Sequence, residues 1–170
     1  AYTVDGSLLV ARGNELFDIA GRHSSSGGLP TTALAVTPKS AKAVVAAGNP
    51  GSNGMVYVRN QPVVAIAAKV AHTDVVLDLA VSPNESVLAT SSYDSQVKIW
   101  DCNDLTLLHT LKEHWDAVYG FAFSPDSKLL ATTGADRSVK VWNVEAGKLL
   151  YTLSEATDWN YAVAWGPVGK

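Results

Sequence analysis

The chain has 170 residues, of which 47% are hydrophobic and 17% are charged, and its net charge is −3. This composition is typical of a globular protein and excludes a disordered chain. No apolar run reaches the length of a membrane helix, the N-terminal residues do not resemble a signal peptide, and the single Cys102 excludes an internal disulfide. The excess of 16 acidic over 13 basic residues argues against nucleic acid as the main partner, and we expect no membrane partner.

Residues 1–71 are expected to hold two units of a repeating β-fold. Residues 1–28 form a partial unit, in which 23–28 are expected to be a flexible polar linker. Residues 29–71 form a divergent unit with an enlarged glycine-rich loop at 48–54. Its four strands are predicted at 32–36, 43–47, 55–59 and 63–69.

A 42-residue segment occurs twice in succession, at residues 72–113 and 114–155. Apolar runs of period two, separated by turn residues, predict four short strands in each copy. They are expected at 75–81, 87–92, 96–101 and 105–111, and at 117–123, 129–134, 138–143 and 148–153. A repeat of this length made of short strands is typical of a propeller. The sequence therefore predicts an all-β fold, a β-propeller of four-stranded antiparallel blades.

Residues 156–170 are expected to begin a further blade, with a leading strand at 159–165. The whole chain, 1–170, would then be one propeller domain of about four blade equivalents. Two arrangements are open. Either strand 159–165 pairs with the front strands and closes a four-bladed ring, or the chain is part of a larger propeller with open edges that pair with another copy.

Both copies of the repeat carry the same motifs in the same order: a His, Ser-Pro, Leu-Ala-Thr, a turn Asp, and Val-Lys-Ile/Val followed by Trp-Asp or Trp-Asn. With these motifs the chain resembles the WD-repeat (WD40) β-propeller family. The resemblance is closest over 72–155, moderate over 29–71 and 156–167, and weakest over 1–28. The divergent unit departs from the pattern, because Val58-Arg59 stands where the Trp-Asp pair is expected and no His lies near Gly27.

One set of residues could be taken for a catalytic triad. His72, Ser91 and Asp94 have the residue types of a Ser-His-Asp hydrolase, but the same positions recur in the second copy with Thr in place of Ser, which argues against catalysis. In WD-repeat proteins the matching His, Ser/Thr, Asp and Trp form a buried hydrogen-bonded tetrad. The resemblance therefore implies two structural tetrads, His72, Ser91, Asp94 and Trp100 in one copy and His114, Thr133, Asp136 and Trp142 in the other.

No other constellation predicts chemistry. The glycine-rich loop 48–54 lacks the Gly-Lys-Ser/Thr end of a phosphate-binding loop, and no histidine has cysteine or acidic partners at ligand spacing. Asp78, Asp116 and Asp158 fall near the inner strands, but a catalytic carboxylate pair would also need a cleft. We expect no enzymatic activity, catalytic residue, cofactor or metal.

In the family that the chain resembles, partners commonly dock on the face that carries the His-containing loops. Carried over by alignment, and with one neighbouring Trp, the outward positions are Val75, Leu77, Tyr93, Trp115, Ala117, Tyr119, Ala135, Trp159 and Tyr161. Aromatic side chains on a rigid rim suit a protein-binding hot spot, because they bury a large area at low entropic cost. Asp74, Asp116 and Asp158 on the same rim favour a partner with basic residues.

The first functional hypothesis is a non-catalytic scaffold that binds a protein or peptide through this face. A second is a structural role, in which open blade edges associate into a larger propeller, for instance as a homodimer. A third is an accessory domain of a larger enzyme whose chemistry lies in other sequence.

Overall fold

The computed structural model describes residues 9–12, 15–18, 23–25, 29–37, 42–60 and 64–166, and all structural statements concern these residues. They form fifteen strands in four sheets and contain no helix that could cross a membrane. The first sheet contains β1 (Leu9–Arg12), β2 (Glu15–Asp18) and β3 (His23–Ser25). The second contains β4 (Thr31–Val36), β5 (Lys42–Ala47), β6 (Gly54–Asn60) and β7 (Val64–His72). The third contains β8 (Val76–Val81), β9 (Val87–Ser92), β10 (Val97–Asp101) and β11 (Leu107–Leu111). The fourth contains β12 (Val118–Phe123), β13 (Leu129–Gly134), β14 (Val139–Asn143) and β15 (Lys148–Leu153).

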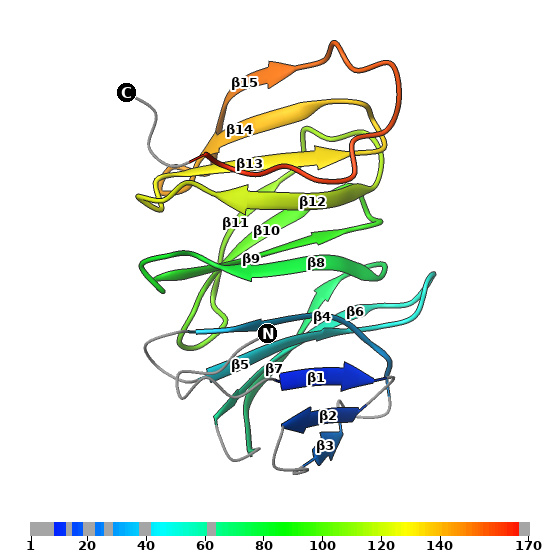
Figure 1. Cartoon of the computed structure of the whole chain (residues 1–170), viewed down its shortest axis with the longest axis vertical. Coiled ribbons are helices and arrows are strands. Elements are labelled where there is room, and N and C mark those ends of the chain that lie inside the picture. Colours follow the sequence, from blue (N-terminus) through cyan, green and yellow to red (C-terminus); the bar gives the residue numbers. More distant parts are fainter. Residues whose placement is uncertain are drawn as a thin grey trace.

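Within each sheet, every strand pairs in antiparallel fashion with its neighbours in sequence, so each four-stranded sheet is a meander of the kind that forms a propeller blade. The sheets are stacked face to face along the long axis of the molecule (Figure 1). The first strands β4, β8 and β12 lie next to one another in that order, and β1 lies next to β4. The prediction of four-stranded antiparallel blades is thus confirmed, and the eight strands expected in 72–155 are present.

The hydrophobic core lies between blades. Along β9 successive side chains point to opposite faces of the sheet, as in any β-strand. Leu88 packs with Trp100 against the β4–β7 blade, and Ala89 packs with Ile99 against the β12–β15 blade. All four of these side chains are almost completely buried. The β8–β11 blade is therefore stabilised on both faces by its neighbours.

Each first strand contains a β-bulge at the same place. The register shifts between Val76 and Asp78 in β8 and between Val118 and Gly120 in β12, which leaves Leu77 and Tyr119 as the extra residues. The corresponding shift in β4 lies between Thr31 and Ala33. A bulge turns the extra side chain away from the regular alternation of the strand. The changed direction of the side chain explains why an aromatic residue at this position reaches the rim of the blade.

The strand expected at 159–165 does not form. Residues 154–166 contain no strand, and this segment runs back across β12 and β13 (Figure 1). It is held by single hydrogen bonds: the Asn160 amide donates to the Gly134 carbonyl at 3.1 Å, the Thr133 hydroxyl donates to the Asn160 carbonyl at 3.2 Å, and the Trp165 indole donates to the Ala122 carbonyl at 2.9 Å. Without a partner strand these residues have no ladder to join.

Two further expectations need correction. The four sheets are not closed into a ring, since the 159–165 segment lies against the last blade instead of pairing with the first sheet. Residues 23–25, expected to belong to a polar linker, form β3 and pair with β2. Residues 26–28, the rest of that linker, lie outside the described part of the chain.

Candidate functional site

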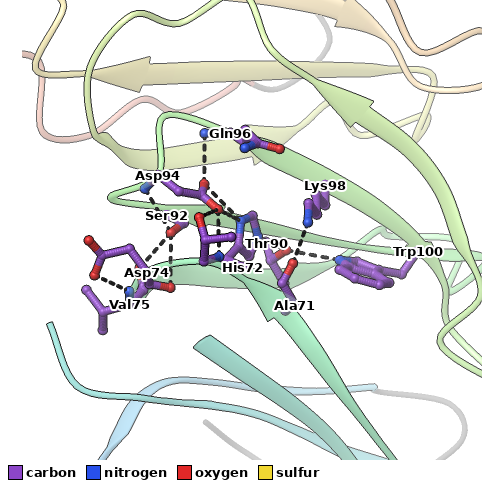
Figure 2. Close-up of polar contacts among 11 residues, drawn as sticks. Ala71, His72, Asp74, Val75, Thr90, Ser92, Asp94, Gln96, Lys98 and Trp100 are labelled. Atoms are coloured by element: carbon purple, nitrogen blue, oxygen red, sulfur yellow. Dashed lines mark hydrogen bonds and ion pairs between the residues drawn. The ribbon is translucent and has the colours of Figure 1, made fainter. Parts of the chain in front are cut away.

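The polar centre of the β8–β11 blade is a chain of buried hydrogen bonds (Figure 2). His72 Nδ1 lies 3.0 Å from both carboxylate oxygens of Asp94, and His72 Nε2 lies 2.8 Å from Thr90 Oγ1. The indole Nε1 of Trp100 donates to the same Thr90 oxygen at 3.0 Å. Three elements contribute to it: the end of β7, strand β9 with its turn, and strand β10.

The donors and acceptors of this chain fix its direction. The Trp100 N–H can only donate, so the Thr90 oxygen accepts from it and its own proton is directed to His72 Nε2. His72 is then the tautomer with its proton on Nδ1, and this N–H donates to Asp94. A neutral imidazole thus satisfies every member of the chain at once, which is the arrangement that buried polar groups require.

The β12–β15 blade repeats the arrangement with greater burial. His114 Nδ1 lies 2.7 Å from Asp136 Oδ2, His114 Nε2 lies 2.7 Å from Thr132 Oγ1, and Trp142 Nε1 donates to Thr132 at 2.9 Å. The Ser138 hydroxyl and amide also donate to Asp136 Oδ1, at 2.8 and 3.1 Å. Asp136 therefore closes the β13–β14 turn as well as the tetrad.

The predicted hydroxyl residues of both tetrads are wrong by one position. Ser91 and Thr133 were expected, but the hydroxyls belong to Thr90 and Thr132. The register explains the error: Trp100 pairs with Leu88, so Thr90, two residues on, shares the face of Trp100, and Ser91 points to the opposite face. The Ser91 hydroxyl is buried with no hydrogen-bond partner among the described residues, and the Thr133 hydroxyl donates instead to the Asn160 carbonyl.

Burial and hydrogen bonding set the charge states of these groups. Burial lowers the pKa of His114 more strongly than the neighbouring Asp136 raises it, so the imidazole is neutral at pH 7. Burial by itself would raise the pKa of Asp136, but the hydrogen bonds from Ser138 and His114 outweigh it and lower the pKa. Burial would also raise the pKa of Asp94, but the neighbouring His72 and the amides of Thr73 and Gln96 together outweigh it and lower the pKa.

The tetrads have no reactive group to offer a substrate. The His72 and His114 rings and the Thr90 and Thr132 hydroxyls are buried, and their polar atoms are already paired within the blade. In the described part of the chain, no three His, Cys, Asp or Glu side chains come together as metal ligands do. These residues therefore act by holding strands and loops together.

The exposed candidate site lies at the rim, on the face that carries the His loops. Four rings form it, and we call Tyr93, Tyr119, Trp159 and Tyr161 the rim cluster. Tyr119 and Tyr161 stack with their centroids 5.1 Å apart, Tyr93 meets Tyr119 edge-on at 6.2 Å, and Trp159 lies 6.1 Å from Tyr119. Tyr93 comes from the β9–β10 turn, Tyr119 from the bulge of β12, and the other two from the segment after β15.

The remaining aligned positions divide by exposure. Trp115 is 68% exposed and stands apart from the ring contacts found among the described residues, and Leu77 is partly buried. Val75, Ala117 and Ala135 are at most 5% exposed, so their side chains offer no surface to a partner. Ala117 and Ala135 approach each other through the backbone, with the Ala135 amide donating to the Ala117 carbonyl at 2.8 Å. These three positions support the rim from below.

Asp74, Asp116 and Asp158 share one local geometry. In each, Oδ1 accepts the amide of the next residue, at 2.6 to 2.7 Å. This bond fixes each carboxylate beside a candidate rim position. Asp116 and Asp158 are exposed, and the charge of Asp116 contributes to a raised pKa of Tyr119, after burial and the neighbouring Tyr93 and Tyr161.

The docking of the 159–165 segment was not foreseen from the sequence. A Cβ atom on Gly120 would lie 3.0 Å from the Tyr161 carbonyl oxygen, so the missing side chain at this position lets the two backbones approach. One feature of the repeat could have predicted this close approach: Gly120 takes the place that Asp78 has in the preceding copy. This contact brings Tyr161 onto Tyr119.

Comparison with known proteins agrees with this geometry. The family model "WD domain, G-beta repeat" matches residues 66–101 and 105–143. One similar solved structure, "Structure of U3-55K", has a TM-score of 0.70 and 29% sequence identity, and the match covers 77% of this chain. It covers 41% of U3-55K, so this chain spans less than half the length of that WD-repeat protein. No curated protein matches significantly.

WD40 repeats are generally non-catalytic scaffolds for protein interaction. The first matched range ends with β10 and the second runs from β11 to β14, so this part of the chain is similar to WD repeats.

Proposed function

We propose that the chain binds a protein or peptide through the face that carries the His loops, with the rim cluster as the hot spot. The observation that supports this proposal is the exposure of three of the four rings, while Tyr119 is partly buried. Tyr161 is 63% exposed, Trp159 51% and Tyr93 49%, although each of them contacts another ring of the rim cluster. Large apolar rings are rarely left together on a surface without a partner.

The blade below the rim cluster provides the rigidity that a binding surface needs. Tyr119 projects from a strand whose neighbours are fixed by the His114 tetrad, and Tyr93 directly precedes Asp94 of the other tetrad. Tyr93 and Tyr119 are therefore oriented before any partner arrives, which reduces the entropy lost on binding. This arrangement favours a binding surface over a flexible aromatic patch.

The proposal is tested by selecting peptides from a random display library on the purified chain and measuring their affinity by fluorescence anisotropy. We expect the double variant W159A/Y161A to weaken binding by at least about tenfold, as is usual for aromatic hot spots. The matched control is Y151A, because Tyr151 on β15 is also 49% exposed but lies outside the rim cluster. Selected peptides that bind W159A/Y161A as tightly as the unmodified chain would exclude the rim as the hot spot.

A further inference from the structure

The surroundings of the rim cluster carry negative charge that no cation within the described part of the chain balances. Asp116 and Asp158 each have Oδ1 tied to a backbone amide, at 2.7 Å in both cases, and neither forms an ion pair with a described Lys or Arg. The two ion pairs found among the described residues belong to the tetrads. The rim is thus both aromatic and acidic.

A further carboxylate lies where the segment after β15 docks. Asp78 is partly buried, and its Oδ2 lies 3.8 Å from where a Cβ on Gly120 would be. The Tyr161 carbonyl oxygen, at 3.0 Å, and the Ala162 Cα, at 3.8 Å, lie near the same point. Its only donors among the described residues are the amides of Leu79, at 2.8 Å, and Phe121, at 3.4 Å. Burial raises the pKa of Asp78, and the two amide bonds offset this effect only in part. A carboxylate held this way is stabilised by an approaching cation.

The packing of the rings determines the shape of ligand that fits. Tyr119 and Tyr161 stack at 5.1 Å with an interplanar angle of 21°, so no group can enter between them. A ligand must instead lie across their exposed faces and edges. A planar cation suits such a surface, because it stacks on aromatic faces and is less strongly hydrated than an ammonium group.

We propose that the rim cluster takes an arginine side chain of the bound protein, with the guanidinium against the rings of Tyr119, Trp159 and Tyr161 and with Asp116 and Asp158 as its counter-charges. The inference rests on the proposed function, since it names the chemistry of the group that this binding face receives. A purely apolar occupant fits less well, because it would take carboxylates out of water without pairing them. A cation satisfies the rings and the carboxylates together.

The test uses two small probes that share a shape and differ in charge, N-acetyl-arginine amide and N-acetyl-citrulline amide. Each is titrated into the chain with ¹⁵N-labelled tryptophan, and the indole signal of Trp159, assigned by comparison with W159F, is followed by NMR. We expect the arginine probe to bind about fivefold more tightly than the citrulline probe, the upper end of the effect that a cation over exposed rings produces.

Two variants locate the site. D116N should reduce the preference for arginine over citrulline, and Y161A should reduce the binding of both probes. The control Y151A should change neither. Equal binding of the two probes to the unmodified chain would overturn the inference, as would a preference for arginine that Y161A leaves intact.

The two proposals can fail separately. If library peptides depend on the rim cluster but tolerate replacement of each arginine by citrulline within about twofold, the arginine inference is overturned and the proposed function stands. If the arginine probe binds at the rim with the expected preference and the selected peptides ignore W159A/Y161A, the cation site stands and the proposed function is overturned.

Discussion

The β8–β11 and β4–β7 blades pack against each other, yet they are built differently inside. Their registers correspond, because Leu79 pairs with Thr90 in one blade as Leu34 pairs with Val45 in the other. Val45, which is completely buried, therefore takes the place of the Thr90 hydroxyl. The β4–β7 blade forms all three of its strand ladders with an aliphatic residue at this position. Ladders and packing between blades are enough to make a blade.

The tetrad must therefore have a more local effect. In the β8–β11 blade, Asp94 also accepts the amides of Thr73 and Gln96, at 3.1 Å each, so the tetrad fixes the His loop and the β9–β10 turn to the sheet. Tyr93 of the rim cluster lies in that turn. The difference between the two blades indicates that strand ladders are enough to form a blade, and that the tetrad adds stability by tying the His loop and the β9–β10 turn to the sheet.

The largest expected effect is the loss of the acid in the more buried tetrad. D136A removes the acceptor of His114 and Ser138, and both lie in the interior. We expect the free energy of unfolding to fall by about 3 kcal/mol, because the remaining partners keep their desolvation cost. Urea denaturation measures it, with D126A on the exposed Ser-Pro turn as the milder control. A loss below about 0.5 kcal/mol would contradict a structural role for the tetrad.

A second prediction gives the two adjacent hydroxyls of β9 opposite effects. T90V introduces the residue that the neighbouring blade has and leaves His72 Nε2 and the Trp100 indole without their partner, so we expect a loss of about 2 kcal/mol. S91A removes a buried hydroxyl that has no partner and should be neutral or slightly stabilising. Thermal and urea unfolding of the two variants compare them. A larger loss of stability in S91A than in T90V would show that Ser91, not Thr90, belongs to the tetrad.

The tetrads also predict how stability depends on pH. Because burial lowers the pKa of His114, the unfolded chain takes up a proton near the ordinary value of 6.5 while the folded chain does not, so stability falls as the pH drops below this value. Because the pKa of Asp136 is lowered, the folded state loses further stability when the pH falls below 3.8, the ordinary pKa of this group. Asp78, whose pKa is raised, acts in the opposite direction. Urea unfolding between pH 7.5 and 5 measures the first effect, which should be absent in H114Q.

The smallest expected effect concerns turn strain. Arg137 has a φ of 61°, and Ser95, at the same place in the preceding copy, has 64°. A left-handed backbone disfavours residues with a Cβ, so R137G should stabilise the chain by about 0.5 kcal/mol. K128G is the matched control, because this exposed residue of the same blade is outside the left-handed region, and glycine there should destabilise. Equal effects of both variants would show that strain at this turn does not matter.

Much of the fold could be predicted from the sequence, because the period of two within strands and the period of 42 between copies are both visible in it. The tetrad hydroxyls were misplaced because adjacent Thr90-Ser91 and Thr132-Thr133 offer the same chemistry, and only the register against Trp100 decides which face each takes. The same register shows that Arg59, not Val58, takes the place of Trp100 in the β4–β7 blade.

The rim was predicted in part for a related reason. Tyr93, Tyr119, Trp159 and Tyr161 come together as the alignment implies, but burial of Val75, Ala117 and Ala135 depends on the packing of the loops above them. The path of residues 159–165 depends on which strands are available to pair with them. Sequence periodicity contains neither kind of information.

The most direct test of the account compares T132V with Y161A in one experiment that measures stability and the affinity of a selected peptide. We expect T132V to lower the free energy of unfolding by about 2 kcal/mol and to change affinity little at a temperature where it is folded. Y161A should leave stability nearly unchanged and weaken the peptide by at least about tenfold. If T132V abolished binding without loss of stability, or Y161A bound the peptide normally, the division between a structural tetrad and a binding rim would be wrong.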